Sequence, residues 1–221
     1  MKEYFKLGTI LFVICAIAAL SLGLVNGLTK DVIAENRDIS STDLVELLPG
    51  AVHKNQITVS NVDLEAKAYV DKAFEVGGND GLLGYVFKVV TGGFHGNIEM
   101  FVAISKEDKL SGIKITSQSE TAGLGARISE ENFMAAFKNK NIEKGISMTK
   151  NGASKDNEVD AITGATVSSN AVAAGVNKAV AFYMETIKGV EFDLDELDTS
   201  SGATGESEGD VDTSSEASVS Q

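Results

Sequence analysis

The sequence is poor in the residues that build disulfides and metal centres. Its 221 residues include one cysteine, Cys15, two histidines, one proline and no tryptophan. One cysteine cannot form an intrachain disulfide, and this chain alone cannot supply the thiolates of an iron–sulfur cluster. His53 and His95 are far apart and lack the spacing of metal ligands, so we expect both to be surface or loop residues.

Basic residues are also scarce relative to acidic ones. The chain has 19 Lys and Arg against 32 Asp and Glu, a net charge of −13, which argues against a nucleic-acid partner. Residues 191–221 contain ten acidic residues and no basic ones, leaving 22 acidic against 19 basic in the rest. This Ser- and Gly-rich acidic tail has too few apolar groups to offset backbone ordering, about 1–2 kcal/mol per residue, and we expect it to be disordered.

Catalytic constellations are missing as well. We find no set of nucleophile, base and acid, and no glycine-rich dinucleotide turn in a βαβ setting. An independent enzyme is therefore the least favoured class.

A long uncharged run dominates the N-terminal part. Residues 7–29 have no charged side chain. Residues 7–25 alone would span about 28 Å as a helix at ~1.5 Å per residue, close to the ~30 Å hydrocarbon core of a bilayer. Because residues 1–6 include two lysines and the flank after the run is mixed, the positive-inside rule favours a cytoplasmic N-terminus and an extracytoplasmic domain.

Three other interpretations of this run are weaker. A cleaved signal peptide usually has an apolar region of only ~7–15 residues. A lipoprotein box needs a small residue before Cys15, where Ile14 stands. A buried core helix would show a polar face, and none is present. We therefore expect an uncleaved single-pass anchor in the lipid bilayer of the cell membrane.

The body of the chain predicts an α+β fold. Residues 30–42 would form a helical connector, and residues 43–190 one mixed domain with an antiparallel sheet and flanking helices. The expected helices are 43–50, 130–139 and 168–188, the expected strands are 66–75, 83–91, 98–105 and 110–116, and an edge strand is expected at 145–149 within a polar loop.

The most informative motif is residues 160–169, which read Asp-Ala-Ile-Thr-Gly-Ala-Thr-Val-Ser-Ser. A long helical pattern follows at once, so Ser168 or Ser169 is placed to cap that helix. Free amides and the helix dipole at its N-terminus favour a phosphate. Thr166 stands just ahead of the expected helix, with an oxygen that a phosphate could esterify.

This motif resembles the (Ser/Thr)-Gly-Ala-Thr flavinylation motif of FMN-binding domains. Such domains occur in the G subunit of Rnf electron-transport complexes and in the C subunit of sodium-pumping NADH:quinone reductases. The resemblance implies covalent FMN, bound through a phosphoester to Thr166. It also implies that Gly164 and Ala165 keep the turn free of bulk, and that Thr163, Val167 and Ser168 contact the phosphate or its neighbours.

Two further roles remain alternatives at this motif. Ser168 is a fallback attachment point, although helix capping is the better interpretation of its hydroxyl. Asp160 suits recognition by a flavin transferase, or a turn hydrogen bond, better than redox chemistry.

A second element lies upstream, where residues 119–125 read Ser-Glu-Thr-Ala-Gly-Leu-Gly. Two glycines two residues apart let the backbone approach a ligand closely. The element resembles the Glu-Thr-Pro-Gly-Leu-Gly sequence that the same family has before its flavinylation site, with Ala122 replacing proline. The resemblance implies that the flavin ring or ribityl chain is bordered by Glu120, Thr121, Gly123, Leu124 and Gly125.

An aromatic cover for the flavin is a weaker expectation. Tyr85, Phe87, Phe94 and Phe101 are candidates, but ordinary core packing is the favoured role for each.

The acidic tail repeats the flavinylation pattern. Residues 198–204 read Asp-Thr-Ser-Ser-Gly-Ala-Thr, which makes Thr204 a possible second attachment site. Against it, no helix follows to hold a phosphate, and a tail of this composition generates such a tetrapeptide by chance.

The resemblance implies a function. The G subunit of an Rnf-type complex is an electron-transfer subunit of a membrane-bound, ion-translocating ferredoxin:NAD oxidoreductase. Its partners are other integral-membrane subunits and, for maturation, a flavin transferase that uses FAD. The alternatives are a stand-alone extracytoplasmic flavoprotein, the C subunit of a sodium-translocating NADH:quinone reductase, and an anchored binding module without cofactor.

Overall fold

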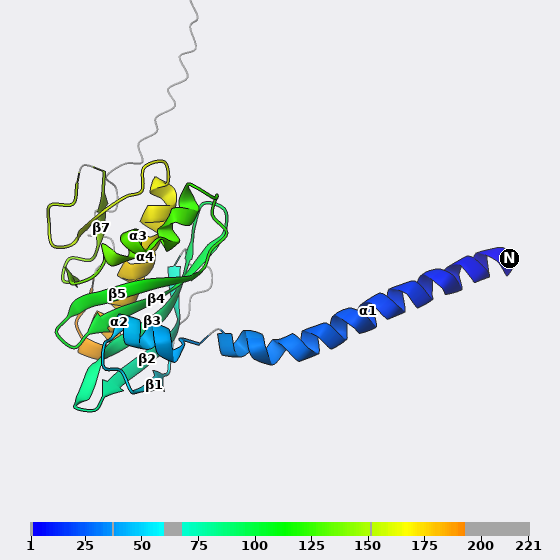
Figure 1. Cartoon of the computed structure of the whole chain (residues 1–221), viewed down its shortest axis with the longest axis horizontal. Helices are drawn as coiled ribbons and strands as arrows, with labels where there is room; N and C mark the ends of the chain where they lie inside the picture. The colour runs from blue at the N-terminus through cyan, green and yellow to red at the C-terminus, as the bar shows by residue number, and fades with distance from the viewer. Residues whose placement is uncertain (1, 37, 60–67, 151, 193–221) are drawn as a thin grey trace, which may run out of the picture.

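Helix α1 (Lys2–Asn36) extends away from the rest of the chain as one long element in the computed structural model (Figure 1). The structure describes residues 2–36, 38–59, 68–150 and 152–192. Within α1, the window Gly8–Val25 has a mean hydropathy of 2.5 and packs against nothing else in the described chain. Its length and composition suit a membrane span, as predicted. The expected connector continues α1 without a break as far as Asn36.

The domain is built on a six-stranded antiparallel meander in the order β1-β2-β3-β4-β5-β6. The strands are β1 (His53–Ile57), β2 (Ala68–Gly78), β3 (Gly81–Gly92), β4 (Asn97–Ser105), β5 (Lys109–Ser117) and β6 (Lys140–Asn141). The four central strands coincide with the four predicted ones, because their β-branched and aromatic residues fit a pleated surface. The two edge strands β1 and β6 were not predicted.

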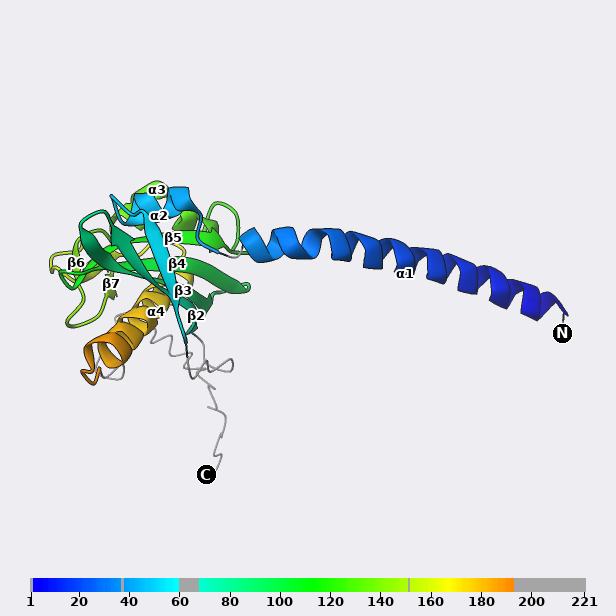
Figure 2. The same cartoon turned by 90° about the horizontal axis from the view of Figure 1, so that it is seen from below.

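Helices cover both faces of this sheet (Figure 2). On one face, α4 (Thr166–Phe182) continues as a π-helical segment, Tyr183–Lys188. The predicted apolar stripe of α4 is confirmed, since Val172, Val176 and Val180 are fully buried against the sheet. On the other face, α2 (Ser41–Leu47) covers a smaller core. The α+β fold class predicted from the sequence is therefore correct.

The segment after β5 differs from its prediction. The 3₁₀ helix η1 (Gly125–Ser129) leads into α3, which covers only Glu131–Ala135 of the helix expected at 130–139. Asn139 ends the following turns, because its backbone is left-handed (φ 59°) and its amide binds the Leu110 carbonyl at 2.8 Å. The chain thus turns back to pair β6 with β5.

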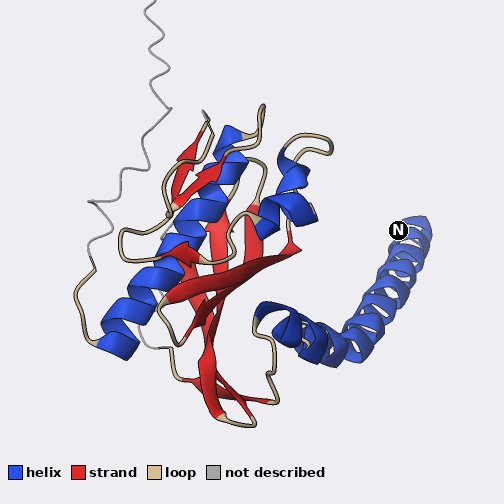
Figure 3. Cartoon of the chain, turned by 60° about the vertical axis from the view of Figure 1, so that its left-hand side comes forward, coloured by secondary structure: helices blue, strands red, loops and turns tan. Residues whose placement is uncertain are grey.

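Two further strands lie beside α4 (Figure 3). They are β7 (Ser147–Thr149), inside the expected edge strand, and β8 (Glu158–Asp160), which was not predicted. They pair in parallel, with Thr149 opposite Asp160. Strand β8 delivers the chain directly to the motif that precedes α4.

Lysines tie the segment after α1 to the sheet. Lys72 on β2 forms an ion pair with Asp38, and the Lys54 ammonium donates to the Ile39 carbonyl at 2.9 Å. These contacts join the end of the connector to β1 and β2. The predicted disorder of the acidic tail, apart from residues 191 and 192, lies outside the described residues.

Candidate functional site

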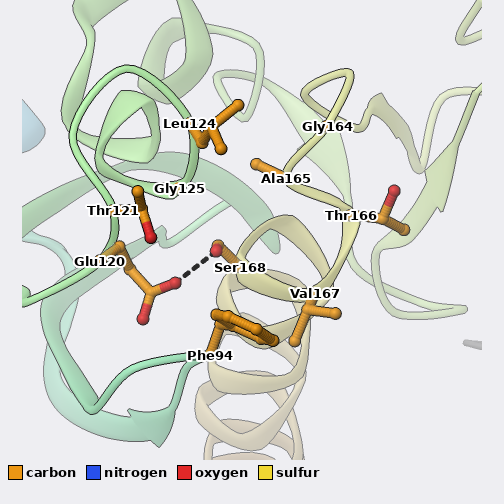
Figure 4. A pocket seen from close by; sticks show the side chains of 10 residues that line it. All are labelled: Phe94, Glu120, Thr121, Leu124, Gly125, Gly164, Ala165, Thr166, Val167 and Ser168. Atoms are coloured by element: carbon orange, nitrogen blue, oxygen red, sulfur yellow. Dashed lines mark hydrogen bonds between the residues drawn. The ribbon is translucent and has the colours of Figure 1, made fainter.

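The two sequence motifs meet at one pocket of about 330 Å³ (Figure 4). The loop between β5 and η1 forms one wall, the turn into α4 forms the other, and the loop after β3 contributes one aromatic ring. Its volume lies at the lower end of the ~300–1,000 Å³ typical of ligand pockets. The lining residues are Phe94, Glu120, Thr121, Leu124, Gly125, Gly164, Ala165, Thr166, Val167 and Ser168.

Nine of the eleven residues expected around the flavin line this pocket. Thr163 and Gly123 belong to the same two turns, but they are exposed and are not among the lining residues. Thr204 lies outside the described residues. The structure therefore brings together two segments that are distant in sequence.

Helix α4 begins at Thr166, two residues earlier than predicted. The Ser169 amide makes the first helical hydrogen bond, 2.9 Å to the Ala165 carbonyl. The amides of residues 166–168 therefore have no partner within the helix. Together with the helix dipole they form an electropositive end that suits a phosphate.

The capping role predicted for Ser168 or Ser169 is wrong. Ala165 is the N-cap, and no side chain caps the helix. Instead, the Ser169 hydroxyl donates to the Ala165 carbonyl at 2.9 Å and accepts from the Ile162 amide at 3.0 Å. These bonds close the turn that holds Gly164 at φ 81°, a conformation that favours glycine.

The Ser168 hydroxyl is occupied by a different partner. It donates to a carboxylate oxygen of Glu120 at 2.5 Å, and both side chains are more than nine-tenths buried. The His95 amide donates to the other oxygen of Glu120 at 2.9 Å. A hydroxyl held in this way is poorly placed as an attachment point, whereas Thr166 is only half-buried, and its side chain points away from this pair (Figure 4).

The environment of Glu120 keeps its carboxyl ionised. Burial pushes its pKa upward, but hydrogen bonds from the Ser168 hydroxyl and from the His95 and Phe94 amides outweigh burial, so the pKa lies below its usual value. The pocket therefore contains a fixed negative charge at neutral pH.

The rim of the pocket is apolar and open. Phe94, Leu124 and Val167 expose 66%, 47% and 55% of their surfaces, an unusual concentration of large apolar side chains. An electropositive helix end beside an apolar rim fits the two parts of FMN, a phosphate and a flat ring. The residues present therefore suit this cofactor.

Core packing was expected for all four candidate aromatic residues, and this is wrong for Phe94 alone. Phe87 and Phe101 are buried in the two cores, and Tyr85 packs 5.5 Å from the Tyr183 ring. Phe94 instead lines the pocket. The sequence did contain an indication of this role: Phe94 lies in a glycine-rich loop, where no neighbouring helix or strand residues are available to bury a large apolar side chain.

The position of His95 had no signal in the sequence. It is an exposed loop residue, as expected, but its Nδ1 lies 3.1 Å from the hydroxyl of Thr121, a residue that lines the pocket. Across residues 2–36, 38–59, 68–150 and 152–192, no group of three His, Cys, Asp or Glu residues is arranged to hold a metal ion.

Comparison with known proteins agrees with this geometry. The FMN-binding domain family matches residues 93–181, which include the whole pocket. A structure of the C subunit of the Na⁺-translocating NADH-quinone reductase from Parabacteroides distasonis shares the fold, with a TM-score of 0.50 and 20% identity over 67% of this chain and 84% of that one.

Two relatives each align with more than four-fifths of the chain. The G subunit of the Na⁺-translocating ferredoxin:NAD⁺ oxidoreductase complex of Acetobacterium woodii is 34% identical over 85% of this chain and 95% of its own length. The G subunit of the ion-translocating oxidoreductase complex of Methanosarcina acetivorans is 32% identical over 81% and 94%. The chain thus belongs to the FMN-binding domain family and, within it, to the G subunits of Rnf-type ion-translocating oxidoreductase complexes.

Proposed function

We propose that the chain is the electron-transfer subunit of a membrane-bound, Rnf-type ferredoxin:NAD oxidoreductase, and that Thr166 holds its FMN through a phosphoester. The observation that carries this proposal is the convergence of both family motifs on one pocket at the N-terminus of α4. Family membership supports FMN as the cofactor and the other proteins of the complex as partners.

The chain's own residues bind and orient the cofactor. Bound FMN supplies the redox chemistry, and the protein supplies attachment and electrostatics. The amides of residues 166–168 would hold the phosphate, Gly164 and Ala165 would leave room for it, and Thr163 would support the turn. The apolar rim and the turn of residues 121–125 would contact the ring or the ribityl chain.

Attachment requires a separate flavin transferase that uses FAD. In that transfer the Thr166 hydroxyl oxygen would bond to the flavin-side phosphorus of FAD as the diphosphate bond breaks and AMP leaves. The hydroxyl proton would pass to a base of the transferase. Asp160 is exposed just before the turn, which supports a role in recognition by that enzyme.

Helix α1 anchors the domain to the cell membrane. The two lysines before the apolar window favour a cytoplasmic N-terminus, which places the flavin domain on the extracytoplasmic side. An anchor at this position keeps the covalently held flavin near the integral-membrane partner proteins.

Peptide mass spectrometry tests the attachment site. Cleavage after lysine releases residues 156–178, which contain Thr166, separately from residues 189–221, which contain Thr204. In protein made with the transferase, we expect one FMN mass on the first fragment. The Thr166→Ala variant should lose it and Thr166→Ser should retain it, while Thr116→Ala, an exposed threonine on β5, serves as the control. Unmodified wild-type protein would refute the proposal, and a flavin on the second fragment would establish Thr204 as a second site.

A further inference from the structure

Glu120 joins three separate segments at the base of the pocket. It belongs to the loop after β5, one of its oxygens accepts from Ser168 in the first turn of α4, and the other accepts from the His95 amide in the loop after β3. Figure 4 shows the carboxylate pointing toward the Ser168 hydroxyl, to which it is hydrogen-bonded. Only 8% of the residue is exposed. The Thr121 hydroxyl, 3.1 Å from His95 Nδ1, adds a second contact between the loops after β5 and β3 but does not reach α4.

The backbone around the carboxylate is packed too closely for a side chain at two positions. A Cβ atom on Gly93 would lie 2.5 Å from Oε1 of Glu120, and one on Gly125 would lie 2.8 Å from Oε2 and 2.6 Å from the Ser168 hydroxyl oxygen. Real Cβ atoms do not approach so closely. Both glycines therefore serve to let the two loops close over this carboxylate.

No lysine or arginine in the described residues neutralises the charge of Glu120, and of the ionisable side chains His95 acts on it electrostatically. Among the ion pairs of the described residues, none joins Glu120 to a lysine or arginine. Its partners are a hydroxyl and backbone amides, which stabilise the anion but leave its net charge. Structural linkage alone needs only an acceptor oxygen, which a neutral glutamine would also supply, so the retained charge points to a second role.

We propose that Glu120 is the positioning and tuning residue of the flavin pocket: it holds the Phe94–His95 loop against the first turn of α4, and its uncompensated negative charge lowers the reduction potential of the flavin. This inference rests on the proposed function, since it requires FMN in the pocket. Reduction adds negative charge to the flavin, and a fixed anion in a partly buried site opposes that change more strongly than it would in water. Glu120 would thus both hold the pocket loops together and contribute the negative charge that lowers the reduction potential.

The test uses the full-length chain, made with a flavin transferase, and three substitutions. Glu120→Gln keeps the size and an acceptor oxygen for the His95 amide but removes the charge. Ser168→Ala keeps the charge and removes one donor. Glu130→Gln is the control, because it removes the same charge from an exposed residue that pairs with Arg127.

The midpoint potential is measured by redox titration of the covalently flavinylated fraction, so that altered flavin loading does not enter the result. We expect a positive shift for Glu120→Gln that clearly exceeds the shifts of Ser168→Ala and Glu130→Gln. A Glu120→Gln potential equal to wild type, or a shift no larger than that of the control, would overturn the tuning role. Absence of covalent flavin from wild type would instead refute the proposed function.

Hydrogen exchange of the flavin-free chain tests the positioning role. Amides of residues 93–96 should exchange faster in Glu120→Ala, and Glu120→Gln should restore part of the protection because its oxygen still accepts from His95. Equal protection in wild type and Glu120→Ala would show that the carboxylate does not hold this loop.

Discussion

Asn177 pairs with the backbone of Ile146 through both ends of its side-chain amide. Its Nδ2 donates to the Ile146 carbonyl at 2.9 Å, and its Oδ1 accepts from the Ile146 amide at 2.6 Å. Asn177 is 2% exposed, so water cannot replace either bond. This pair fastens the segment that leads into β7 onto α4.

Replacing Asn177 by alanine should destabilise the domain. Two buried backbone groups of Ile146 would lose their partners, and each unsatisfied group costs about 1–3 kcal/mol. We expect a loss of about 2–4 kcal/mol in the free energy of unfolding, measured by urea denaturation of the full chain in detergent. Lys178→Ala, a half-buried neighbour on the same helix, is the matched control and should change little. A loss no larger than that of the control would contradict this account.

Gly84 on β3 should not tolerate alanine. A Cβ atom there would lie 2.2 Å from the Ile104 carbonyl oxygen and 2.9 Å from the Ser105 Cα, both backbone atoms of the paired strand β4. The strands would have to separate locally, and overpacking of this kind costs about 1–3 kcal/mol.

The matched control for Gly84→Ala is Gly112→Ala on β5. There the nearest atom to an added Cβ is a side-chain carbon of Leu47 at 3.4 Å, an ordinary contact. Thermal unfolding should show a clearly lower melting temperature for Gly84→Ala alone. Equal melting temperatures for the two variants would show that β3 and β4 adjust freely.

Elements with a strong repeating pattern were predictable from the sequence. The stripe through Val172, Val176 and Val180 identified α4, because a buried helix face requires that spacing. The edge strand β1 was not predicted because its sequence, His-Lys-Asn-Gln-Ile, is mostly polar. It pairs with β2 through backbone hydrogen bonds, which any residue except proline can make. The place where the turns after α3 end was not predictable, because it depends on the bond from Asn139 to Leu110, a long-range contact.

The site was predictable as a set of residues but not as a network. The two motifs identified the walls, since their turn chemistry is local. Side-chain partners such as Glu120 with Ser168, and Thr121 with His95, depend on how distant loops meet. Ser168 does not act as a cap because α4 begins at Thr166, which places Ser168 inside the first turn, where its hydroxyl donates to Glu120.

The ion pair between Asp38 and Lys72 should make the connector acid-sensitive. The hydrogen bond from Lys72 lowers the pKa of Asp38 below its usual value, and the charges of Lys72, Lys54 and Lys88 act in the same direction. A lowered folded-state pKa contributes stability above the unfolded-state value of about 3.9, and this contribution disappears as the pH falls through the folded-state pKa.

Asp38→Asn should therefore be less stable than wild type at neutral pH and equal to it in strong acid. Urea denaturation at a series of pH values measures the difference, which we expect to be small because both partners are partly exposed. Glu107→Gln is the control, since its pair with Lys106 is exposed and 4.0 Å long. If wild type stayed more stable than Asp38→Asn by the same amount at the lowest pH, the stability difference would come from side-chain packing and not from the charge of Asp38.

Ala122 occupies a position where proline should stabilise the pocket wall. The Leu124 amide binds the Thr121 carbonyl at 3.1 Å, and Gly123 has φ 76°. These are the features of a type II turn, which favours proline at its second position and glycine at its third. Ala122→Pro should raise the free energy of unfolding by about 0.4–1 kcal/mol, because it restricts the unfolded chain.

Gly123→Ala probes the same turn in the opposite direction. Its left-handed backbone penalises a side chain although nothing lies within 4 Å of the added Cβ, so the cost arises from conformation and not from a clash. Thermal unfolding of the two variants should therefore move the melting temperature upward for Ala122→Pro and downward for Gly123→Ala. A fall in both would mean that the loop needs freedom at residue 122 in order to close over Glu120.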